Sequence, residues 1–164
     1  MKKLLTAALF FATPLYAGAD DAFVEFKVVK PEVAIKMAVA AMEHCRAGGY
    51  MVGVSVVDRF GVTQAFVRDR FAGPHVEETA RRKAWTSVSF RTDTLSFSET
   101  TQAGKEAYGI RFISQALPLG GGVPVEAEGS IVGGIGVSGA PGGDIDDACA
   151  RAGIAAVEDE LQGF

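Results

Sequence analysis

The chain has 164 residues, of which 48% are hydrophobic and 22% charged, the balance of one ordinary globular domain. This composition excludes a disordered tail, a collagenous or coiled-coil rod and a disulfide-rich miniprotein. The net charge of −4 and the lack of long Lys/Arg runs argue against a nucleic-acid partner.

Residues 1–19 are predicted to be an export signal peptide. Two lysines precede a short apolar run, and Ala17-Gly18-Ala19 has the small residues of a cleavage site. The run is shorter than the roughly 20 residues of a membrane-spanning helix, although a buried N-terminal helix is an alternative. We expect a soluble product with no membrane span, periplasmic or secreted, that begins with an N-terminal arm over residues 20–30.

Export would place the two cysteines, Cys45 and Cys149, in an oxidising compartment. Cys45 lies in the first predicted helix and Cys149 in the last. One disulfide and two separately buried thiols are both compatible with this placement. A disulfide requires Cα atoms within about 7 Å of each other, a distance that the sequence does not show.

The first half of the chain predicts a helix, a hairpin and a second helix. Pro31 begins the first helix, and Gly48-Gly49 ends it. The β-type segments 50–58 and 62–68 flank a turn and predict a hairpin. A second helix opens at Pro74. Its inward stripe consists of small residues, so we expect it to lie close to a sheet.

The second half predicts further strands and a last helix. Residues 110–119 are expected to hold a strand. A second hairpin is predicted over residues 123–126 and 130–137, and a final helix over residues 144–161. Because adjacent hairpins favour an antiparallel sheet covered by helices, residues 31–164 are predicted to form a single α+β domain.

Several kinds of site are excluded by spacing. The sequence has no cysteine pair at metal-ligand spacing and only two histidines, 31 residues apart, which excludes a structural zinc site. It also lacks a Gly-x-Ser-x-Gly elbow. The loop Gly120–Gly122 is not followed by Gly-Lys-Ser/Thr, so it is not a phosphate loop. We interpret it as backbone that passes close to a ligand or to another subunit.

His75 is the stronger candidate metal ligand of the two histidines. It follows Pro74 at the start of the second helix, where the positive helix end favours the neutral imidazole that binds metals. The preceding Phe71-Ala72-Gly73 is apolar and flexible, as a ligand slot would be. The alternative is an exposed histidine without a role. His44 is expected to be partly buried and bonded to a backbone carbonyl.

Lys83 lies on the small-residue stripe of the second helix. A lysine that faces inward needs a carboxylate or an anionic ligand, and Asp58 is the expected partner. The alternative is a side chain that extends past the stripe to solvent. A local basic group suits a ligand with carboxylates, or else pairs with Glu77 and Glu78. Its other members are Arg68, Arg70, Arg81 and Arg82.

Four segments of the chain resemble the GlcG/HbpS-like family, above all Ile131–Gly139. The other three are Val56-Val57-Asp58 with Gly61, Ala80–Thr86 and Gly120–Pro124. That family includes the C-terminal domain of PduO-type adenosyltransferases, and the resemblance covers about residues 31–160. It implies a five-stranded antiparallel sheet flanked by helices, assembly into homo-oligomers and, as in several members, haem binding. It also implies first and last helices on one face of the sheet.

That arrangement would bring Cys45 and Cys149 together. The resemblance also implies a haem site in which His75 ligates the iron. Lys83, Arg82 or Arg70 would contact the haem propionates. The backbone of Gly120, Gly121 and Gly122 would contact the ring.

These expectations describe an exported haem (tetrapyrrole) binding protein without catalysis of its own. The alternatives are an enzyme that acts on haem or a small organic acid through Lys83 and Asp58, and an accessory subunit of a periplasmic oxidation system. We also expect a homo-oligomer, held by Trp85 and residues 95–112, because the aromatic side chains there do not share the predicted inward stripes.

Overall fold

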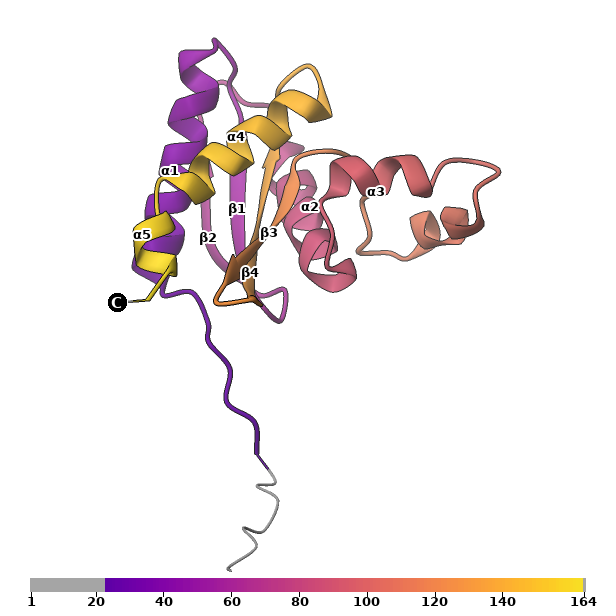
Figure 1. Cartoon of the computed structure of the whole chain (residues 1–164). Helices are drawn as coiled ribbons and strands as arrows, with labels where there is room; N and C mark the ends of the chain where they lie inside the picture. The colour runs from indigo at the N-terminus through magenta and orange to yellow at the C-terminus, as the bar shows by residue number, and fades with distance from the viewer. Residues whose placement is uncertain (1–22, 164) are drawn as a thin grey trace, which may run out of the picture.

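The computed structural model describes residues 23–163, so the predicted export signal lies outside the described residues. A four-stranded antiparallel sheet of order β2-β1-β4-β3 forms the centre of the molecule (Figure 1). The elements in chain order are α1 (Pro31–Ala47), β1 (Gly53–Asp58), β2 (Thr63–Arg68), α2 (Val76–Phe90), α3 (Thr94–Thr100), the 3₁₀ helix η1 (Glu106–Phe112), β3 (Gly122–Ala127), β4 (Ser130–Ser138), α4 (Gly143–Ala155) and α5 (Glu158–Leu161).

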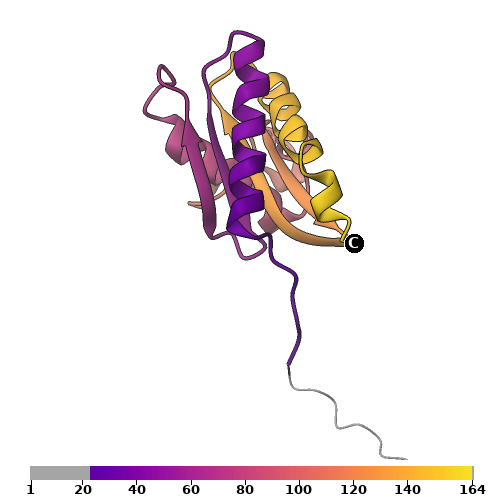
Figure 2. The same ribbon diagram turned by 90° about the vertical axis from the view of Figure 1, so that its left-hand side faces the viewer.

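Helices α1 and α4 lie side by side on one face of the sheet (Figure 2). Small side chains such as Ala38 and Ala41 on α1 let the two helices approach, and with Met37 they fill the core above the valines of β1. Cys45 and Cys149 form a disulfide between these helices, with their Cα atoms 5.5 Å apart. The predicted disulfide is therefore present in the structure.

Helix α2 covers the opposite face, over β1 and β4. It approaches β4 so closely that a Cβ atom at Gly136 would overlap with the carbonyl oxygen of Ala80, and one at Gly134 would lie 2.6 Å from Val88. The alanines of the α2 stripe are fully buried against this surface. The predicted contact between a small-residue helix and a glycine-rich strand is confirmed, and it explains glycines in a strand centre.

The fifth strand predicted over residues 110–119 is absent from the described part of the chain. Residues up to Phe112 belong to η1, and the backbone that follows is bound by α2. Arg82 donates to the carbonyl of Ala116 at 2.8 Å, and the Leu117 N–H donates to the Thr86 hydroxyl at 2.8 Å. These groups are therefore not available for a strand ladder, and α3 and η1 project away from the sheet (Figure 1).

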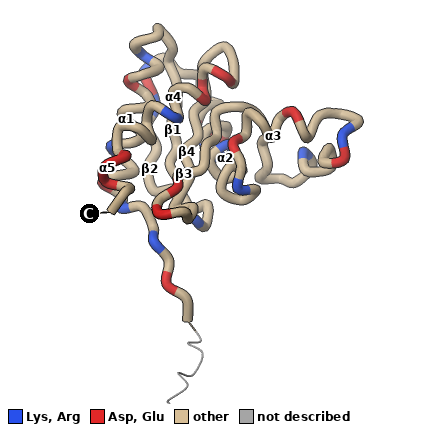
Figure 3. The backbone as a smooth tube through the Cα atoms, in the orientation of Figure 1, with Lys and Arg blue, Asp and Glu red and all other residues tan. Residues whose placement is uncertain are grey.

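Two helix boundaries also differ from the prediction. Helix α2 begins at Val76, and His75 is its N-cap residue. The last helix ends at Ala155, and the short acidic α5 follows. Figure 3 shows acidic α5 beside basic positions of α1, where Glu160 pairs with Lys36. Within residues 23–163, no helix has the length and apolarity that crossing a membrane would require.

Candidate functional site

Lys83 is almost fully buried, with 1% of its surface exposed. Its Nζ atom donates to Asp146 Oδ2 at 2.8 Å and to the carbonyl of Val137 at 2.9 Å. The ion pair therefore joins α2 to the start of α4 and the end of β4. The expectation of an anionic partner is met, but Asp58 as that partner is wrong.

Asp58 instead organises the β1–β2 turn. Its Oδ1 atom accepts hydrogen bonds from the backbone N–H groups of Phe60 and Val62, at 2.8 and 3.0 Å. Its Oδ2 atom accepts a third from Gln64 at 3.2 Å. Both carboxylate oxygens are thus used locally. A carboxylate at a strand end can close its own turn, and this competes with any longer-range role.

Burial dominates the titration of the ion pair. It lowers the pKa of Lys83 below its usual value, against the attraction of Asp146, which raises it. Burial also raises the pKa of Asp146, against the attraction of Lys83 and a hydrogen bond from Ala140 N–H, both of which lower it. Each charge therefore depends on the other for its stability in this position.

The loop Gly120–Gly122 lies directly against this ion pair and is buried. Gly121 has a φ of +115°, and a Cβ atom there would lie 3.1 Å from Lys83 Nζ. Its carbonyl accepts from Val137 N–H at 2.8 Å, and Gly122 N–H donates to the Thr94 hydroxyl at 2.7 Å. The loop does make the close backbone approach that the glycines predict, and it approaches α2, α4 and β4 of the same chain.

His75 is exposed and is the N-cap residue of α2. Its ring packs over Gly73, where a Cβ atom would lie 2.7 Å from Nδ1 and 3.9 Å from Nε2. Thr79 Oγ1 lies within hydrogen-bonding distance of both the His75 carbonyl and the Ser138 hydroxyl. The backbone at His75 is thereby fixed, and Nε2 is the ring nitrogen farther from Gly73.

Two side-chain hydrogen bonds hold the loop before His75 in place. Buried Asp69 accepts from Arg46 Nε of α1 at 2.8 Å, and the Arg68 guanidinium donates to the carbonyl of Ala72 at 2.8 Å. Two aromatic rings remain uncovered on this surface. Phe71 is 80% exposed and Phe66 is 37% exposed. Phe66 lies near the first residue of α2, since a Cβ atom at Gly53 would contact both Phe66 and Val76. Phe71 precedes His75 by four residues in the loop that leads into α2.

The predicted cofactor residues do not form one cluster. Arg70 is exposed near His75, whereas Arg82 is held by the carbonyls of residues 115 and 116. His44 is exposed rather than partly buried. Among residues 23–163, no three His, Cys, Asp or Glu side chains gather to hold a metal. Sequence reasoning missed Asp146, whose signal was a pair of acids at the start of a predicted helix.

Three comparisons with known proteins agree with this fold. The family profile described as "Haem degrading protein HbpS-like" matches residues 29–155. The crystal structure of an HbpS double mutant from Streptomyces reticuli is 39% identical, has a TM-score of 0.79, and the match covers 89% of this chain and 97% of that one. The PduOC:haem complex is 30% identical with a TM-score of 0.73, over 79% and 94%.

A curated relative, the corrinoid adenosyltransferase PduO of Salmonella typhimurium, is 34% identical over 61% of this chain. The chain spans only 30% of the length of that protein.

The buried ion pair generates a stability prediction. Lys83→Met leaves Asp146 buried without a counter-charge, and we expect a loss of about 3–5 kcal/mol in the free energy of unfolding. Lys83→Met combined with Asp146→Leu should recover much of the loss, since no charge remains buried. Urea unfolding at pH 7 measures both; equal losses in the single and double variants would contradict the assignment.

The pH dependence of the same variant follows from the raised pKa of Asp146. The folded state binds a proton on Asp146 at a higher pH than the unfolded state does, so protonation stabilises the fold as the pH falls. Without Lys83 this pKa rises further. The stability difference between wild type and Lys83→Met should therefore narrow as the pH falls from 7 toward 4.

Proposed function

Because the chain belongs to the HbpS-like family, we propose that it binds haem, at the surface formed by His75 and its neighbours. The observation that carries the location is the exposed imidazole at the α2 N-cap, together with the exposed ring of Phe71 four residues before it and the ring of Phe66 near Val76. The haem-complex structure of a PduO C-terminal domain, 30% identical, supports the ligand.

The groups at this surface fit the chemistry of haem. An imidazole nitrogen is a common axial ligand of haem iron, and His75 Nε2 is the donor in our proposal. Phe66 and Phe71 would contact the apolar macrocycle. The exposed guanidinium of Arg70 would pair with a propionate. Bound haem would supply an iron centre for ligand binding or redox chemistry.

We assign Lys83, Arg82 and the loop Gly120–Gly122 to the scaffold of this site rather than to contact with haem. Lys83 is bound to Asp146, and Arg82 donates to the 115–116 backbone. The glycine loop has its close contacts inside the protein. These groups would act by fixing α2, whose N-cap residue is His75.

Haem degradation is a second candidate function, favoured by the description of the matching family. It would use the same surface, which is exposed to solvent and therefore accessible to oxygen and a reductant. The distinguishing experiment incubates the haem-loaded protein with ascorbate under air. Loss of the Soret band with release of an open-chain tetrapyrrole identifies degradation, whereas a stable band identifies a binding protein without catalysis.

We also propose that the chain acts outside the cytoplasm, in the periplasm or secreted. The Cys45–Cys149 disulfide supports this, because such bonds persist in oxidising compartments and are rare in the cytosol. The predicted signal peptide supports the same location from sequence.

A homo-oligomer is the final part of the proposal, and the projecting α3–η1 segment is its support. Phe112 is 74% exposed, and its ring contacts that of Tyr108 edge-on, with ring centroids 5.3 Å apart. Trp85 is half-buried and packs on the Gly61 turn and on Phe90. We therefore assign the intersubunit contact to η1 more than to Trp85.

The haem proposal predicts different effects for the two histidines. His75→Ala should shift the Soret band and weaken haem binding by at least about 10–100-fold, the range seen when only the support of a ligand is lost. His44→Ala is the matched control, because it removes an equally exposed imidazole elsewhere. A Soret band and affinity unchanged by His75→Ala would contradict this site.

The oligomer proposal predicts that light scattering of the exported chain at micromolar concentration gives a mass of two or more chains. Phe112→Ser should lower that mass, because it removes the most exposed apolar side chain of η1. Leu119→Ser, an exposed apolar position outside η1, serves as the control. A monomeric wild-type chain would contradict the proposal.

A further inference from the structure

A small cavity of about 300 Å³ lies at the C-terminal end of α2, opposite to His75. It is bounded by the β1–β2 turn, the last turn of α2 and the start of β4. The side chains that matter for its chemistry are Arg59, Arg91, Trp85 and Ser89, with Val88 and Ile131 as apolar wall. Helix α2 has 15 residues, so about 22 Å separates this cavity from the His75 surface.

Among residues 23–163, no hydrogen-bond acceptor is bound to the Arg59 guanidinium. Its guanidinium carbon lies 4.0 Å from the centre of the Phe26 ring and 5.8 Å from that of Phe60. Aromatic contacts of this kind use the face of the guanidinium and leave the N–H groups at its edge. Within residues 23–163, no carboxylate pairs with Arg59.

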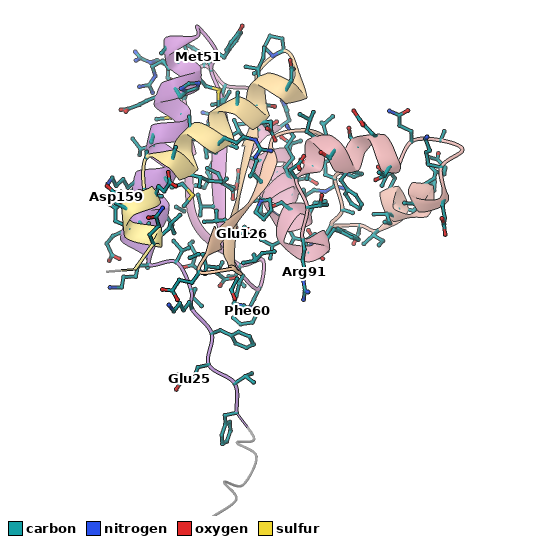
Figure 4. All side chains as sticks on the ribbon, viewed as in Figure 1. Glu25, Met51, Phe60, Arg91, Glu126 and Asp159 are labelled. Carbon is teal, nitrogen blue, oxygen red and sulfur yellow. A yellow bond between two sulfur atoms is a disulfide. The ribbon has the colours of Figure 1, made fainter. Side chains whose placement is uncertain are left out.

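Arg91 supplies a second cation to the same cavity. It is the C-cap residue of α2, with a left-handed φ of 54°, a position where glycine is usual. Figure 4 shows Arg91 and Phe60 at the same end of the molecule. In the described part of the chain, the Arg91 guanidinium has no ion pair and no hydrogen bond. Two guanidinium groups thus share one cavity in an acidic protein.

The remaining walls give the cavity a fixed shape. Gly61, at a φ of +82°, lies so near the indole that a Cβ atom would be 2.5 Å from Trp85 Cδ1 and 2.9 Å from Nε1. Asp58 holds the same turn through two backbone hydrogen bonds. The described lining contains no acidic side chain, and Ser89 adds a hydroxyl donor.

We propose that this cavity is a binding site for a small dianion whose charged groups are carboxylate or phosphate. Two guanidinium groups without counter-charge call for two negative charges, and their planar N–H edges match the oxygen pairs of these groups. The volume is at the lower end of the range for ligand cavities, which favours a small-molecule occupant. The site is independent of the haem proposal, because it shares no residue with the His75 surface.

Trp85 is the only tryptophan of the sequence, so its fluorescence reports on this cavity. The experiment titrates the exported chain with succinate, inorganic phosphate and acetate at low ionic strength, and repeats each titration by calorimetry. We expect saturable binding of succinate, phosphate or both at about 1 mM or below, and much weaker binding of acetate. The dianion that binds identifies the source of the charged group.

Arg59→Gln and Arg91→Gln should each weaken binding by about tenfold or more, because each removes a charge-assisted hydrogen bond. Arg81→Gln is the matched control, because it removes one guanidinium group from α2 at a position outside the cavity. Circular dichroism verifies that every variant folds. Absence of saturation with both dianions, acetate binding as tight as theirs, or an equal loss in Arg81→Gln would each overturn the proposal.

Discussion

The close packing of α2 on β4, together with the Lys83–Asp146 ion pair at the middle of that helix, is the constraint on which the rest of the structure depends. Gly136 brings the helix backbone into contact with the strand, and this leaves little room for solvent beside Lys83. The amino group is therefore desolvated and needs the carboxylate at 2.8 Å. The packing of α2 thus fixes both the position of Lys83 and its need for the charge of Asp146.

A helix held in this way presents its two ends as rigid supports. His75 precedes its first turn and Arg91 follows its last. The proposed haem surface and the proposed dianion cavity are thus carried by one element. Sites supported by helices and strands keep their geometry better than sites built on loops alone.

The opposite face of the sheet carries most of the apolar core. There α1 and α4 bury the larger apolar core, and the Cys45–Cys149 bond ties the two helices together. Arg46 of α1 extends from this layer to Asp69 and so connects it to the loop before His75. The α3–η1 segment, by contrast, carries exposed rings such as Phe112 and contacts the sheet only through its base.

Local pattern was sufficient for most of the fold. Hydrophobic periodicity, proline and glycine positions predicted α1, α2, both hairpins and the turn at Gly61, because these depend on contacts close in sequence. The same reasoning failed at residues 110–119, where β-type composition was overridden by a hydrogen bond from Arg82 to the Ala116 carbonyl and one from Leu117 N–H to the Thr86 hydroxyl. Composition alone does not show which distant side chain will take a backbone group.

The candidate sites divide in the same manner. The sequence by itself placed Lys83 on the small-residue stripe of a helix, predicted a close backbone approach at Gly120–Gly122, and put His75 at a helix start. Only the tertiary structure decided that Asp146 rather than Asp58 pairs with Lys83, and that Arg59 and Arg91 share a cavity. The reason is physical: helical and strand periods orient a side chain locally, whereas its partner is chosen by how elements far apart in the chain pack in three dimensions.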